Sequence, residues 1–328
     1  MTGVICGTGS YTPAWVMDNN DIARLVDTSD EWIQERTGVV TRHIIKDETT
    51  VSMAVESGRR ALEHARTEAG EIDLILVATI SSNVVLPCTA CEVQKELGAV
   101  HATCFDIGGA ACTGFVIAYN TAMAYLASGV YKTALVIGSE SLSAVTNWKD
   151  RGTCILFGDG SGAVVLKAKE GRAYLPVTHS EGAKGMALTC KSRYEKNGLS
   201  AEINPQEFLS AEHFMQMDGQ AVFKFAVKRV PEVVKEVLEV NGVLQEEVSY
   251  YVLHQANKRI VEAVARRLEE APEKFPMNLQ AYGNTSSASI PILLDEMNRQ
   301  GKLKSGQKIV LAGFGAGLTW GASILEWE

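Results

Sequence analysis

The stretch Leu74-Ile75-Leu76-Val77-Ala78 is continuously apolar and rich in branched side chains. Ala134-Leu135-Val136-Ile137-Gly138 and Lys308-Ile309-Val310-Leu311-Ala312 are two further runs of the same kind. Strands that are apolar on both faces are typical of sheets that helices cover on both sides. Because longer helix-like segments separate these runs, the sequence predicts an α/β fold.

The bulk composition limits the classes of function. Of the 328 residues, 46% are hydrophobic and 21% are charged, which suits a large folded core. The net charge of -8 argues against a general nucleic-acid binder. No apolar run is long enough for a membrane span, and no signal peptide is readable. Seven irregularly spaced cysteines indicate reduced thiols, so we expect a cytoplasmic protein.

The two halves of the chain repeat one order of predicted elements. Each half has a helix, a pair of acidic residues, an apolar strand, a second helix, a loop with a candidate functional residue, a third helix and two strands. The helices and strands are Met53–Ala69, Leu74–Thr79, a helix from about Ala90, Ala134–Gly138 and Ala163–Lys167 in the first half, and Phe223–Val240, Tyr250–His254, a helix from Lys258, Ile309–Ala312 and Gly321–Glu326 in the second. This order predicts a duplicated α/β unit. It also predicts that Cys112 and Asn284 stand at matching helix starts, and that His254 ends a strand matching Leu74–Thr79.

Cys112 is the first candidate for chemistry. It lies in Gly108-Gly109-Ala110-Ala111-Cys112-Thr113-Gly114-Phe115, before an apolar helix that runs from Phe115 to about Ala127. On such a strand-to-helix turn the sulfur would lie at the positive end of the helix, which lowers a thiol's pKa and favours the thiolate. From this context alone a nucleophile and a buried structural cysteine are equally good interpretations.

Two polar residues and a glycine-rich segment are further candidates. His254 closes an apolar strand, and ligands bind at strand ends in α/β folds. Asn284 lies in a Thr- and Ser-rich loop, where a helix cap is the simplest interpretation unless the duplication directs the loop to the pocket of Cys112. The amides of Gly313-Phe314-Gly315-Ala316-Gly317 could donate hydrogen bonds to an oxyanion.

Cys88-Thr89-Ala90-Cys91 is a Cys-x-x-Cys sequence between a predicted strand and a predicted helix. A redox pair is conceivable there, but a plain helix start is the favoured interpretation. A single pair of cysteines is weak evidence for zinc, and we predict no metal site.

Together these motifs resemble the β-ketoacyl-acyl-carrier-protein synthase III family of the thiolase-like superfamily. The matching stretches are Asp27-Thr28-Ser29-Asp30-Glu31-Trp32-Ile33, Arg36-Thr37-Gly38, Ala111-Cys112-Thr113-Gly114-Phe115, Asp150-Arg151-Gly152-Thr153, Phe157-Gly158-Asp159-Gly160, His254-Gln255-Ala256-Asn257, Gly283-Asn284-Thr285-Ser286 and Thr319-Trp320-Gly321. The resemblance implies a five-layered αβαβα fold from two duplicated halves, residues 1–172 and 173–328. It also implies a homodimer.

The resemblance further implies a function and a set of site residues. The family starts type II fatty-acid synthesis by moving a short acyl group from coenzyme A to a cysteine and condensing it with malonyl-acyl-carrier protein. Cys112 would be the nucleophile, with His254 and Asn284 as partners and the backbone amides of Cys112 and Ala316 as the oxyanion hole. The matching coenzyme A positions are Thr28, Trp32, Arg36, Arg151, Gly219, Phe223, Ala256 and Asn257. Those of the carrier-protein docking surface are Gln255, Lys258, Arg259, Lys224, Arg266 and Arg267. No metal or redox cofactor is required.

Three stretches depart from the common family pattern and leave the primer's length and shape open. The approach to Cys112 is one residue longer, Gly315-Ala316-Gly317-Leu318 replaces a triple glycine and an aromatic residue, and Ser82–Leu86 is unusual. A related synthase of secondary metabolism with another starter group is therefore an alternative. A Cys-His-Asn peptidase and a non-enzymatic acyl-CoA-binding protein are weaker ones.

Overall fold

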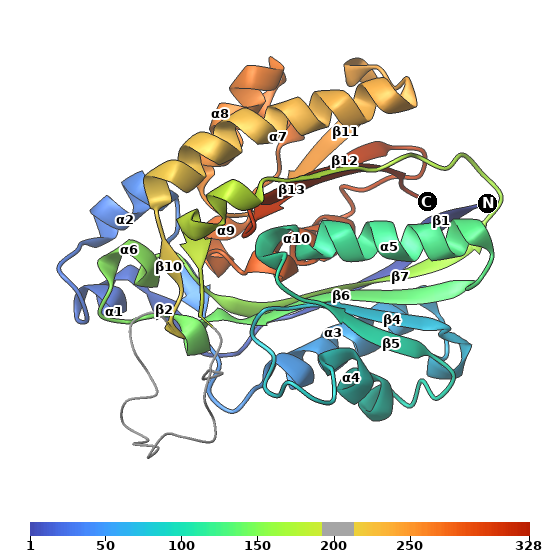
Figure 1. Ribbon diagram of the computed structural model, residues 1–328, viewed down its shortest axis with the longest axis horizontal. Coiled ribbons are helices and arrows are strands. Elements are labelled where there is room, and N and C mark those ends of the chain that lie inside the picture. The colour runs from blue at the N-terminus through green and yellow to red at the C-terminus, as the bar shows by residue number, and fades with distance from the viewer. Residues whose placement is uncertain (192–212) are drawn as a thin grey trace.

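The computed structural model describes residues 1–191 and 213–328, which build two mixed β-sheets with helices on their faces (Figure 1). The first sheet has the order β1-β7-β6-β4-β5 and the second the order β8-β13-β12-β11. The strands are β1 (Thr2–Tyr11), β4 (Leu74–Ala78), β5 (Thr103–Ile107), β6 (Thr133–Ser141), β7 (Asp159–Lys169), β8 (Val177–Ser180), β11 (Val248–Leu253), β12 (Lys308–Gly315) and β13 (Thr319–Glu326). The predicted α/β class is confirmed.

The two sheets share one pairing pattern. In the first, β1 is antiparallel to β7, β7 is antiparallel to β6, and β6 is parallel to β4. In the second, β8, β13, β12 and β11 follow the same sequence of antiparallel, antiparallel and parallel pairs. The first sheet adds β5, parallel to β4, which has no counterpart among the described strands.

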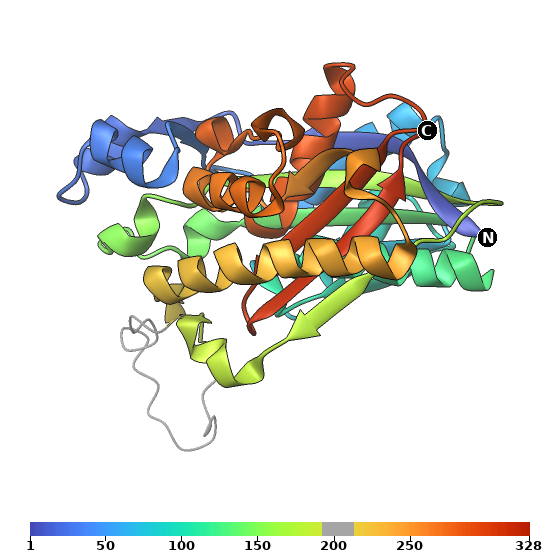
Figure 2. The same ribbon diagram turned by 90° about the horizontal axis from the view of Figure 1, so that it is seen from above.

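Helices fill the space between the sheets and cover their outer faces. α5 (Gly114–Ser128) and α10 (Ser289–Arg299) lie between the sheets, where Phe115 and Ile290 share one apolar core with Leu76 and Leu311. α3 (Thr50–Ala65) and α4 (Thr89–Leu97) pack on the outer face of the first sheet. Figure 2 shows α7 (Gly219–Asn241) lying along the second sheet, with α8 (Lys258–Leu268) beside it. Within the described part of the chain, no helix is long and apolar enough to cross a membrane.

Smaller elements gather at one end of the sheets around Ile22, Ile33, Leu142 and Leu279. They are α1 (Asn19–Ala23), α2 (Asp30–Thr37), α6 (Arg151–Cys154), α9 (Leu279–Tyr282), β2 (Val16–Asp18), β3 (Thr41–His43), β9 (Leu188–Thr189) and β10 (Gln216–Met217). The 3₁₀ turns are η1 (Ala69–Glu71), η2 (Ala111–Thr113), η3 (Leu142–Val145), η4 (Gly182–Ala187), η6 (Gln245–Glu247), η7 (Pro272–Lys274) and η8 (Ser286–Ala288).

The acidic residues that precede two matching strands form the same local hydrogen bond. The Glu71 carboxylate accepts the Glu68 backbone N–H at 2.8 Å, just before β4. The Glu247 carboxylate accepts the Leu244 N–H at 2.7 Å, just before β11. Each bond closes a 3₁₀ turn, η1 or η6, so the repeated acidic pattern has a structural cause.

The helix starts differ from the prediction in one respect. Cys112 lies in η2, two residues before α5 begins at Gly114. The residue at that place before α10, which begins at Ser289, is Ser287 in η8. Asn284 therefore precedes the counterpart of Cys112 by three residues.

A substitution at Gly138 on β6 tests how tightly the first sheet packs on η8. A Cβ at Gly138 would lie 2.3 Å from the carbonyl oxygen of Ser287, and a backbone atom cannot move aside as the end of a flexible side chain can. We expect Gly138→Ala to lower the free energy of unfolding by about 2 kcal/mol or more in urea titrations. Gly70→Ala is the matched control, because nothing lies within 4 Å of the added carbon. Equal stability of the two variants would contradict the packing described here.

Candidate active site

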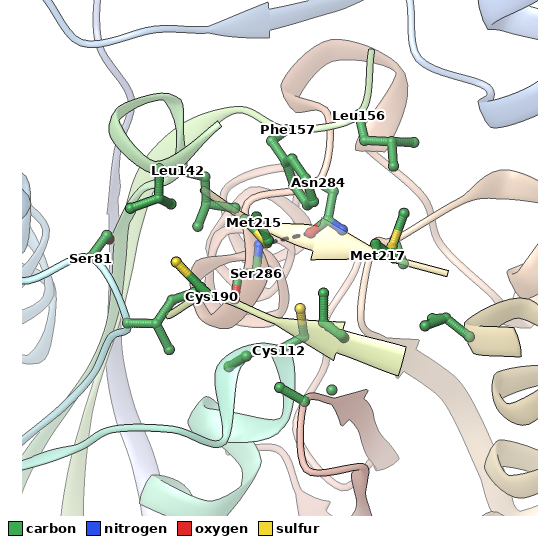
Figure 3. A pocket seen from close by; sticks show the side chains of 18 of the residues that line it. Ser81, Cys112, Leu142, Leu156, Phe157, Cys190, Met215, Met217, Asn284 and Ser286 are labelled. Atoms are coloured by element: carbon green, nitrogen blue, oxygen red, sulfur yellow. Dashed lines mark hydrogen bonds between the residues drawn. The ribbon is translucent and has the colours of Figure 1, made fainter. Parts of the chain in front are cut away.

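A single cavity of 1290 Å³ is lined by Cys112, His254 and Asn284, which come from three distant parts of the chain. Figure 3 shows Cys112 and Asn284 projecting into this space from opposite sides. Trp32, Arg36, Phe223 and Asn257 line it as well, and of these Arg36 is exposed to solvent. The structure therefore brings the three predicted catalytic residues together.

A strained turn places Cys112. Its neighbour Ala111 has φ +45°, a left-handed conformation that is uncommon for a residue with a side chain. The end of β12 packs directly on this turn, because a Cβ at Gly315 would lie 2.8 Å from the Cys112 nitrogen. Ala316 follows and also lines the cavity. The backbone amides of residues 112 and 316 thus belong to adjacent segments at the cavity wall.

The environment of Cys112 differs from the expectation of a lowered thiol pKa. The side chain is buried, and loss of hydration raises its pKa to about 12. A nearby hydroxyl, that of Ser286, opposes this shift without overcoming it. Because α5 begins only at Gly114, beyond the η2 turn, any effect of the helix terminus is outweighed by burial. The resting side chain is therefore a thiol at neutral pH.

His254 directly follows β11, and its backbone N–H donates to Ala312 on β12. Its side chain is 1% exposed, and burial lowers its pKa to about 3, so the imidazole is neutral. Nδ1 lies 2.7 Å from the Ser289 hydroxyl oxygen, which is also 2.8 Å from the carbonyl oxygen of Ser286. Nε2 is therefore the nitrogen left for a ligand in the cavity.

Asn284 is fixed through both its backbone and its side chain. Its N–H donates to the Leu156 carbonyl at 2.8 Å, and its own carbonyl accepts from Gly158 at 3.1 Å. Its Oδ1 accepts the Ser286 backbone N–H at 2.9 Å, as the dashed line in Figure 3 marks. With Oδ1 occupied, the Nδ2 amide is the end that can donate to a substrate.

Comparisons with known proteins bear on this arrangement. Residues 105–182 match the family model for 3-oxoacyl-[acyl-carrier-protein (ACP)] synthase III, and residues 238–327 match that for its C terminal part. The β-ketoacyl-[acyl-carrier-protein] synthase III of Clostridium acetobutylicum is 46% identical over 324 residues, 98% of each chain. This chain belongs to the β-ketoacyl-[acyl-carrier-protein] synthase III family. It is an acyltransferase that carries out the initiating condensation of fatty-acid synthesis.

Solved structures agree with this family. The 3-oxoacyl-[acyl-carrier-protein] synthase III of Aquifex aeolicus has a TM-score of 0.91 at 42% identity, covering 99% of this chain and 100% of its own. The priming β-ketosynthase of the R1128 polyketide biosynthetic pathway also has a TM-score of 0.91, at 33% identity, covering 99% of this chain and 96% of its own. The fold is therefore the thiolase fold of these synthases.

Most residues that the synthase III motifs assign to coenzyme A lie at the cavity. Those in its wall are Trp32, Arg36, Gly219, Phe223, Ala256 and Asn257. Arg151 lies outside the wall, but its guanidinium stacks 4.9 Å from the Trp32 ring centre and donates to the Asp27 carbonyl. Thr28 also lies outside the wall, and its shielded hydroxyl has no hydrogen-bond partner.

The predicted docking residues are less uniform. Lys224 is exposed on α7. Lys258 and Arg259 are exposed on the first turn of α8, with Arg259 stacked 5.6 Å from the ring centre of Phe223. Arg266 and Arg267 are exposed on the last turn of α8. The prediction that Gln255 belongs to the docking surface is wrong. Gln255 is 1% exposed, and its amide is held by Leu253 and Asn278, so it offers no surface to a protein partner.

The Cys-x-x-Cys sequence begins a helix, as favoured from the sequence. Cys88 is the N-cap of α4, and its thiol lies 3.3 Å from that of Cys91, with no disulfide bond between them. The Asp106 carboxylate accepts the first two helix N–H groups in place of a side-chain cap. In the part of the chain that the structure describes, no group of His, Cys, Asp and Glu could hold a metal ion.

Three polar residues around the site were missed from the sequence: Ser289, Ser286 and Glu140. Ser289 contacts His254, and Ser286 contacts Asn284, but serines in a turn look like caps. Glu140 is fully buried at the end of β6. The one detectable signal was this acid in Thr133–Ser141, an otherwise uncharged strand, because an ionisable group there needs buried partners.

The buried imidazole predicts a pH-dependent stability. An unfolded histidine titrates near 6.5, whereas the folded His254 has a pKa of about 3. As the pH falls below about 6.5, the unfolded chain binds a proton that the folded chain does not, so the free energy of unfolding decreases. Between pH 7.5 and 5.0 we expect His254→Gln to remove about 2 kcal/mol of this decrease, measured by urea denaturation. An unchanged pH dependence in the variant would contradict a buried neutral imidazole.

Proposed function

We propose that Cys112 is acylated by a short acyl-CoA, with acetyl-CoA as the primer, and that His254 and Asn284 then drive condensation with malonyl-acyl-carrier protein. The observation that supports these roles most is the shared cavity, which places a thiol, a neutral imidazole and an amide within one wall. The product is a 3-oxoacyl-acyl-carrier protein, which begins a fatty-acid chain.

In the first half-reaction the Cys112 thiolate attacks the thioester carbonyl and expels coenzyme A. The backbone N–H groups of Cys112 and Ala316 form the oxyanion hole, since both segments meet at the cavity. Each such donor typically stabilises the transition state by about 3 kcal/mol. The covalent acyl-cysteine divides one difficult step into two easier ones.

In the second half-reaction the malonyl thioester loses carbon dioxide, and negative charge develops on its thioester oxygen. Two neutral donors suit this charge, because neither gives its proton to the carbanion. Asn284 supplies Nδ2–H. His254 supplies Nε2–H in the tautomer in which Nδ1 accepts the Ser289 hydroxyl proton, which then turns away from the Ser286 carbonyl. The carbanion then attacks the acyl group on Cys112.

The coenzyme A end of the substrate lies among α2, α7 and α8 in this proposal. Trp32 and Arg151 clasp the adenine, and the remaining matched residues contact the pantetheine and phosphates: Thr28, Arg36, Gly219, Phe223, Ala256 and Asn257. Since the Arg151 guanidinium covers the Trp32 ring at 4.9 Å, an adenine must displace it to stack. The unpartnered Thr28 hydroxyl is available as a donor or acceptor.

The carrier protein docks on the exposed cations beside the cavity. Lys224, Lys258 and Arg259 form the part next to the wall, and Arg266 and Arg267 extend the surface along α8. The chain as a whole carries a charge of -8, so a local positive surface is needed to attract an acidic carrier.

We also propose that the fold is the five-layered αβαβα arrangement of two duplicated halves, 1–172 and 173–328. The equal pairing pattern of the two sheets and the matching turns η2 and η8 support a duplication. β5 is an edge strand, and the nearby Val85, Leu86 and Val100 are exposed. Because exposed edges are normally covered, a homodimer formed through this edge is the assembly we infer, in the cytoplasm.

Two alternatives remain distinct from this proposal. A synthase of secondary metabolism with a different starter is favoured by the 33% identity to a polyketide priming ketosynthase, but the relatives in fatty-acid synthesis are more similar. A Cys-His-Asn peptidase requires a thiolate–imidazolium pair, and the buried neutral His254 opposes one. A purely acyl-CoA-binding role would leave the convergence of three reactive groups unexplained.

Intact-protein mass spectrometry after incubation with acetyl-CoA tests the proposal. We expect one acetyl adduct, mapped to Cys112, that malonyl-acyl-carrier protein removes as acetoacetyl-carrier protein. Cys112→Ala should give no adduct. If only a longer or branched acyl-CoA labels Cys112, the acetyl primer is wrong and the result supports the secondary-metabolism alternative. No labelling of Cys112 by any acyl-CoA would overturn the proposed role of this residue.

A further inference from the structure

Glu140 is a buried carboxylate that the proposed reaction does not use. It is 0% exposed at the end of β6, and no basic side chain among the described residues forms an ion pair with it. One oxygen, Oε2, accepts from the Ser81 hydroxyl at 2.6 Å and from the Ile80 N–H at 3.1 Å. The other, Oε1, accepts from the Ser287 hydroxyl at 2.9 Å. These donors are hydroxyls and a backbone N–H, and a buried acid without a neighbouring cation calls for a functional explanation.

Ser286 connects this carboxylate with the nucleophile. Its side chain is 2% exposed, and its hydroxyl has no hydrogen bond of good geometry. It lines the same cavity as Cys112, and Figure 3 shows the two residues facing each other. The hydroxyl is close enough to both neighbours to lower the pKa of the Cys112 thiol and that of the Glu140 carboxyl. An unpartnered hydroxyl between an acid and a thiol is in place for proton transfer.

The conformation of Ser286 also indicates a function. Its φ is +48°, nearly the φ of +45° at Ala111, which holds the same position in the matching turn η2. Residues with side chains rarely adopt this region, and such strain is common at functional sites.

The thiol of Cys112 needs a base before it can attack. Burial raises its pKa to about 12, whereas the His254 pKa of about 3 makes the imidazole a very weak acceptor. Burial makes His254 a weaker base, but it makes Glu140 a stronger one, because it raises the pKa of a carboxyl group. Glu140 is therefore better matched to the thiol than His254 is.

We propose that Ser286 is a catalytic residue that relays the proton of Cys112 to Glu140 when the thiol attacks the acyl-CoA. This proposal rests on the proposed acylation of Cys112. The S–H proton moves to Ser286 Oγ while the hydroxyl proton moves to the Glu140 carboxylate. The thiolate forms a bond to the thioester carbon, the bond to the coenzyme A sulfur breaks, and the leaving thiolate takes the proton back through Ser286. Glu140 is therefore a carboxylate again at the end of the step. It acts on Cys112 only through Ser286 and is a positioning residue.

The test compares Ser286→Ala, Glu140→Gln and the double variant. Alanine is tolerated in the corresponding conformation at Ala111, so Ser286→Ala should fold. We expect each single variant to slow acylation of Cys112 by acetyl-CoA on the order of 100-fold in rapid-quench measurements. The double variant should be no slower than the singles, because both residues serve one relay. Glu140→Asp, which keeps a carboxylate, should recover part of the rate.

The pH dependence of Cys112 alkylation by iodoacetamide provides a readout that needs no acyl-CoA. The profile of Ser286→Ala should shift to higher pH relative to the parent. Ser57→Ala and Asp159→Asn are matched controls, since both are buried outside the cavity wall and should leave the profile unchanged.

The outcomes separate the relay from the acylation itself. Unchanged acylation and alkylation profiles in Ser286→Ala, or additive losses in the double variant, would overturn the relay while leaving Cys112 as the nucleophile. A shift of the alkylation profile in Ser286→Ala supports the relay even if acetyl-CoA proves to be the wrong primer.

Discussion

Close backbone contact between two turns is the constraint on which the site depends. η2 and η8 meet between the sheets, and the strands beside them approach so closely that glycine is needed at Gly138 and Gly315. An added Cβ would come within 2.3 Å of Ser287 in the first case and 2.7 Å of Ala110 in the second. This packing restrains the turns that carry Cys112 and Ser286, because each turn is in close backbone contact with a strand.

Burial follows from that packing and determines the protonation states. It raises the pKa of Cys112 and Glu140 and lowers that of His254, because each charged form loses hydration. A neutral imidazole suits hydrogen-bond donation to a developing oxyanion, and a protonated thiol needs an acceptor. The same desolvation therefore explains why His254 serves as a donor in the proposed mechanism, and why the Cys112 thiol needs a proton acceptor such as the Glu140 carboxylate.

Much of the fold and of the site could be predicted from local sequence. Continuous apolar runs identified β4, β6 and β12, and motif order placed Cys112, His254 and Asn284 at one cavity. The thiol pKa was predicted in the wrong direction, because burial depends on strands distant in sequence. Gln255 was misassigned since its partner Asn278 is 23 residues away. Glu140 contacts Ser287 across 147 residues, a pairing that no local pattern encodes.

The central claim is that one cavity presents an acyl-CoA thioester to Cys112 with its carbonyl oxygen toward Ala316. A crystal structure of the Cys112→Ala variant with acetyl-CoA tests it most directly. The account predicts the thioester carbon over residue 112, its oxygen within hydrogen-bond distance of the residue 112 and Ala316 amides, and the adenine between Trp32 and Arg151. A coenzyme bound outside this cavity, or a thioester directed away from residue 112, would contradict it.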